Sequence, residues 1–410
     1  MGAVFFAGFL MYACNNAAVS VAPVLVLDLG GDAVFAGAQG TAYVLAAILM
    51  RFWFGPLADR VGEGPVMAAG ALAFAVAIPL LAVCESPWQV LGLRIAQAAG
   101  LAAFFPSATA AVMRLAPTGR AGACLGWYRT LSSVALAAGP ALAFAVAAAA
   151  GTGPCLAVLG VCSAAALAAV LAACARGALS RTPGTGALPG TEASGAAGSG
   201  PAEPEGPKES KGRSALRRAL RCAPRAAPAV LAGSFLAALC YGLQANFLGA
   251  HLEAAGMASE ASLAFAAVGA GGVVANPVAG RVGDAGRKGA AALVGLGLLG
   301  LGTMGLGASP QCAQALLPSC ALVGAGYFAT VTSALLVLAD RMPADARSTA
   351  ASLQQNAIDA GMCLAGGGFG VLVSYAGGSE PVFVGWGALV CACAAAGWPA
   401  FAWLRRTHGR

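Results

Sequence analysis

The chain consists largely of uncharged apolar runs that are long enough to cross a lipid bilayer as helices. Residues 66–83 and 290–308 are two examples, and neither contains a charged side chain. About 20 apolar residues in a helix span the hydrocarbon of a bilayer. Only 10% of the 410 residues are charged, whereas soluble domains have about 25%. We therefore predict a protein that crosses the membrane many times.

Cutting the sequence at charged residues and at Gly- and Pro-rich breaks predicts twelve spanning helices. The spans are 3–27, 34–54, 65–84, 87–113, 121–149, 154–175, 226–250, 259–280, 289–308, 312–338, 348–374 and 381–404. Residues 176–225 are rich in Gly, Pro, Ser and Glu, which indicates a disordered linker with a short basic amphipathic helix at 216–222. We predict an all-α membrane protein with two six-helix bundles, 1–175 and 226–410.

The placement of basic residues predicts the orientation, because Lys and Arg are enriched in cytoplasmic loops. They fall on one set of alternate loops, in the linker and at the end of the chain; the set includes Arg51, Arg60, Arg114, Arg120, Arg281, Arg287, Lys288, Arg341, Arg347, Arg405, Arg406 and Arg410. The opposite loops contain no Lys or Arg; their charged residues are all acidic, and His251 is also there. We expect both termini and the linker to be cytoplasmic. We also expect the first apolar run to be a membrane span and not a cleavable signal sequence.

The two predicted bundles resemble each other in sequence. GPLADRVGEG at 55–64 has a counterpart in GRVGDAGRKG at 280–289, each after the second span of its half. Residues 119–140 match 346–367, which aligns Arg129 with Asn356 and Ser132 with Asp359. Two parallel six-helix repeats are an architecture of secondary transporters.

Three short stretches resemble motifs of the major facilitator superfamily. The first is Gly55-x-x-x-Asp59-Arg60-x-Gly62, which is similar to the family's signature between its second and third helices. RIAQAAG at 94–100 is similar to the fourth-helix motif, and Gly139-Pro140 keeps part of the fifth-helix antiporter motif. The resemblance covers the chain outside the linker, and it implies a transporter with two pseudo-symmetric bundles that rock about a central substrate site.

The resemblance also implies a conformational latch at the cytoplasmic side. Its predicted residues are Gly55, Asp59, Arg60, Gly62, Gly280, Asp284 and Arg287. Asp59 ends the second span, where it can face the positive N-terminal end of a neighbouring helix or a basic partner such as Arg120. Two departures from the family pattern occur here: Glu63 and Gly64 replace basic residues, and the second copy is one residue shorter.

Three ionisable residues lie well inside predicted spans, at membrane depth, where charges are costly and usually functional. Asp359 lies near the middle of the eleventh span, and Arg94 and Arg129 lie in the fourth and fifth. Asp359 is our candidate proton carrier, and the two arginines are candidates for coupling or for substrate binding. The alternative is a permanent structural pair or a hydrogen-bonded acid between helices.

Polar residues inside the spans are candidates for lining a central cavity. They are Asn15, Asn16, Gln97, Tyr241, Gln244, Asn246, Gln355 and Asn356. The alternative for each is a hydrogen bond between helices, worth about 0.6 kcal/mol on average.

Motifs for other chemistry are absent from the sequence. It contains no GxxxxGK[ST], HExxH, GxSxG or CxxC pattern, and the 13 cysteines are scattered through apolar runs. We therefore expect no enzyme activity, metal site or cofactor, and no nucleic-acid partner.

These observations predict a secondary active transporter in a bacterial cell membrane. We expect a monomer that exports a small organic or amphipathic compound in exchange for protons. The alternatives are proton-coupled uptake of a small metabolite and, from a different class, a polytopic sensor or interaction protein that transports nothing.

Overall fold

The structure, a computed structural model, describes residues 1–179, 228–342 and 346–408. These residues contain twelve long helices and no strand. The first six helices are α1 (Gly2–Asp28), α2 (Ala33–Val61), α3 (Glu63–Leu81), α4 (Pro87–Leu115), α5 (Ala121–Ala150) and α6 (Thr152–Ala175). The second six are α8 (Pro228–Ala254), α9 (Ala261–Val282), α10 (Lys288–Gly307), α11 (Leu316–Arg341), α12 (Arg347–Tyr375) and α13 (Ser379–His408). The predicted all-α membrane fold is confirmed, whereas the amphipathic helix expected at 216–222 lies outside the described residues.

In each half, one glycine turns the chain between the second and the third helix. The twelve long helices form eleven described segments that are long and apolar enough to span a membrane. The number is one lower because α9 and α10 are continuous in one stretch of 47 residues, Ala261–Gly307. Gly286 breaks that stretch into α9 and α10: it has φ +77° within the short segment η2 (Gly283–Arg287). Gly62 has φ +97° between α2 and α3. Both positions require glycine, because residues with a Cβ rarely adopt these angles.

The helices pack as two bundles that repeat the same arrangement. In the first, α1 packs against α5 and α6, α3 against α4 and α6, and α2 against α4. In the second, α8 packs against α12, α10 against α11 and α13, and α9 against α11. One apolar core contains residues from Val4 to Leu179 and the other contains residues from Ala237 to Ala394.

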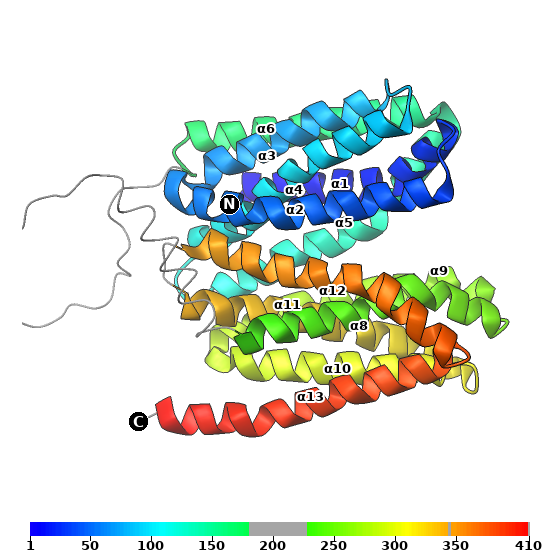
Figure 1. Ribbon diagram of the computed structural model, residues 1–410. Coiled ribbons are helices and arrows are strands. Elements are labelled where there is room, and N and C mark those ends of the chain that lie inside the picture. Colours follow the sequence, from blue (N-terminus) through cyan, green and yellow to red (C-terminus); the bar gives the residue numbers. More distant parts are fainter. Residues whose placement is uncertain (180–227, 343–345, 409–410) are drawn as a thin grey trace, which may run out of the picture.

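The bundles meet through α2 with α12 and through α5 with α9. Figure 1 shows these helices in the middle of the molecule, whereas α3 and α6 lie at one outer face and α10 and α13 at the other. Large apolar side chains on the outer surface, such as Trp53 and Trp88, are 71% exposed. An apolar exterior suits contact with lipid, so this is a multi-pass membrane protein. We call the end of the molecule that holds both termini the terminal end (Figure 1).

Candidate functional site

A cavity of about 270 Å³ lies between the two bundles. Its walls come from α1, α2, α4 and α5 on one side and from α11 and α12 on the other. Its polar and charged lining residues are Asn15, Asn16, Arg51, Ser132, Gln355 and Asp359. Four aromatic residues, Tyr12, Tyr43, Phe105 and Phe328, also line it. A cavity with apolar walls and a few convergent polar groups is typical of a small-molecule site.

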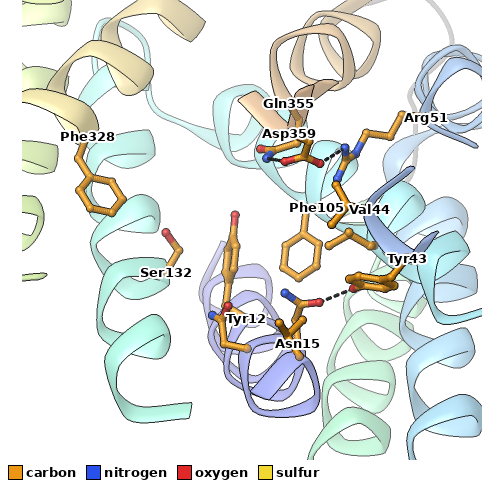
Figure 2. Close-up of a pocket in the computed structure, with 13 residues that line it drawn as sticks. Tyr12, Asn15, Tyr43, Val44, Arg51, Phe105, Ser132, Phe328, Gln355 and Asp359 are labelled. Atoms are coloured by element: carbon orange, nitrogen blue, oxygen red, sulfur yellow. Dashed lines mark hydrogen bonds and ion pairs between the residues drawn. The ribbon is translucent and has the colours of Figure 1, made fainter. Parts of the chain in front are cut away.

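Asp359 of α12 forms an ion pair with Arg51 of α2 at the wall of this cavity (Figure 2). Arg51 Nη1 donates to Asp359 Oδ2, and Gln355 Nε2 donates to Asp359 Oδ1 at 2.9 Å. Arg51 also donates to Asn356 Oδ1 at 3.3 Å, while Asn356 donates to the Ile48 carbonyl at 3.2 Å. The Arg51 side chain is 1% exposed and that of Asp359 is 15% exposed. These contacts join the two bundles by charge at the wall of the cavity.

The position of Arg51 corrects the expectation that it marks a cytoplasmic loop. The second span was expected to end at residue 54, because Gly55 and Pro56 were interpreted as a break. Instead α2 continues through Pro56 to Val61. Packing of α12 against α2 at Gly55 supports the helix there, because a Cβ at Gly55 would lie 2.6 Å from Ser352 Oγ. Arg51 is therefore an intramembrane charge.

Arg94 of α4 lies behind the cavity wall and is fully buried. Its Nε donates to Gln39 Oε1 at 3.1 Å and its Nη1 donates to Gln97 Oε1 at 2.6 Å. The guanidinium lies 3.8 Å from the centroid of the Tyr43 ring, a cation–π contact. Tyr43 faces the cavity and donates to Asn15 Oδ1 at 2.5 Å. One aromatic ring thus separates the charge of Arg94 from the cavity.

Arg129 of α5 is half-buried, one helical turn before the lining residue Ser132. Its backbone carbonyl accepts from Ser132 Oγ at 2.7 Å and from Ser133 Oγ at 3.2 Å. Its charge interacts with Tyr12 and Tyr327. Within the described residues, its guanidinium has no hydrogen-bond or ion-pair partner. The structure therefore does not pair Asp359 with Arg94 or Arg129.

The predicted polar lining residues fall into three groups. Asn15, Asn16 and Gln355 line the cavity. Gln97 and Asn356 lie one layer behind it, bonded to Arg94 and Arg51. The three from α8 do not line it: Tyr241 stacks on Tyr327 at 4.2 Å, Gln244 is buried, and Asn246 donates to the carbonyl of Gly242 at 2.7 Å.

Asp59 binds the N-terminus of α12 at the terminal end. Its Oδ1 accepts from the backbone N–H of Ser348 at 2.8 Å, and its Oδ2 accepts from that of Thr349 at 2.9 Å. The Thr349 hydroxyl also donates to Oδ2. These groups begin a helix whose first N–H groups lack partners within it and carry its positive dipole end. The geometry matches the first of the two partners that the sequence suggested for Asp59, a helix N-terminus.

Asp284 makes the same contact in the other half. Its Oδ1 accepts from Gly122 N–H at 2.7 Å and its Oδ2 accepts from Ala123 N–H at 2.8 Å, at the N-terminus of α5. Each half therefore places one carboxylate on a helix start of the other half. Arg60 and Arg287 follow these acids at exposed positions.

Comparison with known proteins assigns this architecture to a family. A family model described as Major Facilitator Superfamily matches residues 4–366. The chain belongs to the major facilitator superfamily. It is therefore a transporter by family, and nothing in the match indicates an enzyme.

Curated relatives of this superfamily member match over short stretches. It is 36% identical over 88 residues to the multidrug resistance protein MdtG of Erwinia billingiae, which covers 22% of the chain and 21% of the relative. It is 43% identical over 72 residues to a chloramphenicol resistance protein of Pseudomonas aeruginosa, covering 18% and 17%. The chain thus aligns with about a fifth of the length of these relatives.

Solved structures of superfamily transporters share the fold over nearly the whole chain. The human organic anion transporter MFSD10 superposes with a TM-score of 0.66 at 16% identity, covering 96% of this chain and 97% of that one. A bacterial homologue of the iron transporter ferroportin, in an outward-facing state, gives 0.68 at 15% identity, covering 96% and 98%. At these identities the likeness extends to the fold alone.

Glycines of the superfamily motifs lie where helices cross closely. A Cβ at Gly280 would meet the backbone of Gly122, and one at Gly139 would lie 2.7 Å from the carbonyl oxygen of Ala13 in α1. Gly139 thus permits close α1–α5 packing, next to Pro140 inside α5.

Sequence reasoning missed one further pair of charges in each half of this superfamily member. Glu63 at the start of α3 pairs with Arg114 at the end of α4, with Oε2 and Nε 3.1 Å apart. Lys288 at the start of α10 pairs with Asp340 at the end of α11, with Nζ and Oδ2 2.5 Å apart. The two pairs occupy corresponding places with the charges exchanged. The repeat at 55–64 and 280–289 could have revealed this exchange, because it aligns an acid with a base.

Proposed function

We propose that this transporter exports a small organic or amphipathic compound in exchange for protons, with Asp359 as the proton carrier. The observation that supports this most is the ion pair between Asp359 and Arg51 at the cavity wall. Asp359 reaches both the cavity and the other bundle, so its protonation can affect both. The names of the relatives, which are multidrug and chloramphenicol resistance proteins, favour export.

The charge state of Asp359 would set which side of the cavity opens. When Asp359 is ionised, its bond to Arg51 holds α12 against α2. Protonation removes the charge that Arg51 attracts, so the bundles can separate there. A proton taken from outside would thus open the cytoplasmic side, and its release inside would let the bundles close on a bound substrate. This is alternating access by rocking about a central site.

The latch residues would stabilise one of the two states. The distribution of basic residues favours a cytoplasmic position for the terminal end, and the contacts of Asp59 and Asp284 would then close the cytoplasmic side. In this proposal, the structure corresponds to an outward-facing state. Gly55, Gly62 and Gly280 permit the close crossings and turn, and Arg60 and Arg287 anchor the loops to the cytosol. We further propose two bundles bounded at 175 and 226, and a monomer in a bacterial cell membrane.

Accumulation of labelled compounds in efflux-deficient bacteria tests this proposal. The panel would contain dyes, antibiotics, sugars, amino acids and organic acids, each with and without an uncoupler. We expect the wild type to lower accumulation of at least one compound only while the proton gradient exists. Asp359→Asn should abolish the effect, because an amide cannot carry the proton, whereas Glu253→Gln, at the exposed end of α8, should export normally.

Other outcomes would revise the proposal in defined ways. Gradient-dependent export that survives Asp359→Asn would contradict the role of Asp359. Higher accumulation that requires Asp359 and the gradient would instead show uptake by symport.

A further inference from the structure

The intramembrane charges around the cavity do not balance. Among the long helices that the structure describes, Asp359 is the one acidic residue placed away from a helix end. Three arginines lie near it, namely Arg51 at the cavity wall, Arg94 behind Tyr43 and Arg129 one turn from Ser132. The described residues thus give the region an excess of two positive charges.

The three arginines differ in how their charges are satisfied. Arg51 is paired with Asp359, and Arg94 is held by Gln39, Gln97 and the Tyr43 ring. The guanidinium of Arg129 has no such partner in the described part of the chain. A charge inside a membrane protein is costly unless it is paired or faces a water-filled cavity. Arg129 is therefore the group whose charge is left for a ligand.

The internal repeat gives Arg129 the position in its half that Asn356 has in the other half. It aligns Arg129 with Asn356, and Asn356 contacts Arg51 and Ile48 of the opposite bundle. Arg129 also interacts electrostatically with Tyr12, a cavity-lining residue of α1, and with Tyr327 of α11. Because Tyr12 and Tyr327 belong to different bundles, Arg129 lies near the boundary between the two.

We infer that the transported compound is an amphipathic organic anion whose acidic group is bound by Arg129. Its apolar part would contact the aromatic walls, where Tyr12 and Phe105 have ring centroids 4.4 Å apart and Phe328 lies across the cavity (Figure 2). A carboxylate, sulfonate or phosphate accepts two parallel hydrogen bonds from a guanidinium. This inference rests on the proposed function for movement of the compound across the membrane.

An organic cation fits the same cavity poorly. The one carboxylate it would meet is Asp359, whose two oxygens already accept from Arg51 and Gln355. The same cation would be repelled by Arg51 and Arg129. A neutral compound would leave the charge of Arg129 unpaired.

Equilibrium binding of three compounds with one skeleton tests the inference without any need for transport. The probes are radiolabelled 2-naphthoate, 2-naphthamide and 2-naphthylmethylamine, measured on the full-length purified protein at neutral pH. We expect the wild type to bind naphthoate about tenfold more tightly than the amide, and the amine least tightly. Arg129→Gln should remove the preference for naphthoate and leave amide binding unchanged, whereas Arg129→Lys should keep part of it. Arg176→Gln, an exposed arginine after α6, is the matched control.

The outcomes separate this inference from the proposed function. Equal binding of all three probes, no binding of any, tighter binding of the amine, or an equal loss for all three in Arg129→Gln would each overturn the anion assignment. Export that depends on Asp359 would stand in all of these cases. Conversely, a naphthoate preference that requires Arg129, without proton-driven export in cells, would support the anion site and contradict the proposed transport cycle.

Discussion

Arg51 and Asp359 differ in what each can do when its partner is lost. A carboxylate can take up a proton and become neutral, but an arginine stays charged in proteins. Only 1% of the Arg51 side chain is exposed, so water would replace a lost partner poorly. The pair is therefore asymmetric, although its two members contribute to the same bond.

This asymmetry predicts unequal costs for two truncations. Asp359→Leu should destabilise the protein by about 3–5 kcal/mol, because it leaves an unpaired buried charge. Arg51→Leu should cost clearly less, since Asp359 can neutralise itself, and the double variant should recover most of the loss seen in Asp359→Leu. Thermal unfolding of the purified variants in detergent measures these differences. Equal losses in the two single variants would contradict the explanation.

The sequence predicted the acid of this pair but not its base. Asp359 stood out because it interrupts an apolar span, whereas Arg51 lies four residues before Gly55-Pro56, a step that was interpreted as the end of a helix. The partners are 308 positions apart in the chain, and no local pattern shows which helices cross. The same limit explains Tyr241, Gln244 and Asn246, whose positions in a span were clear but whose helix face was not.

At the scale of elements, the latches connect the bundles crosswise. The end of α2 binds the start of α12, and the turn after α9 binds the start of α5. Each contact is made largely by backbone N–H groups on one side, so only the acid can be removed by substitution. The glycines that frame these acids were predicted from sequence motifs, but which helix start each acid contacts follows from the packing of the two bundles.

Loss of one latch acid should loosen the corresponding helix start. Asp59→Asn removes a charged acceptor, which we expect to weaken the closed state by about 1–2 kcal/mol, or about 5–30-fold in population. Hydrogen–deuterium exchange should then rise in the peptide that contains Ser348 and Thr349. Because both latches hold the same two bundles, exchange at Gly122 and Ala123 should rise too.

Two comparisons check this expectation. Asp284→Asn should give the reciprocal pattern, with the larger rise at Gly122 and Ala123. Asp28→Asn, at the end of α1 that lies away from the terminal end, should change hydrogen–deuterium exchange in neither peptide. If hydrogen–deuterium exchange rises at only one helix start in each variant, the two latches open independently of each other.

At the scale of the molecule, the two halves share the same helix arrangement but differ in their pattern of charges. Glu63 with Arg114 and Lys288 with Asp340 join corresponding helix ends with opposite polarity. Each pair links two helices of one bundle, so it depends on local geometry and not on the identity of the half. Either polarity should therefore serve in either place.

Exchanging the charges of one pair tests this equivalence. Glu63→Lys alone puts two cations side by side and should destabilise the protein by about 1–2 kcal/mol. Adding Arg114→Asp should restore stability to within about 1 kcal/mol of the wild type. Thermal unfolding gives both values. Failure of the double variant to recover would mean that the polarity of each pair matters to its own bundle.

The imbalance between three intramembrane arginines and one carboxylate has an electrical consequence. A compound with one negative charge that leaves the cell while one proton enters moves two positive charges inward in each cycle. Each charge gains about 2.3 kcal/mol per 100 mV of membrane potential. Every 100 mV, negative inside, then supplies about 4.6 kcal/mol, enough to sustain a concentration ratio of about 10³. Such an exporter would be powered mainly by voltage, and it would continue to work when the internal and external pH are equal.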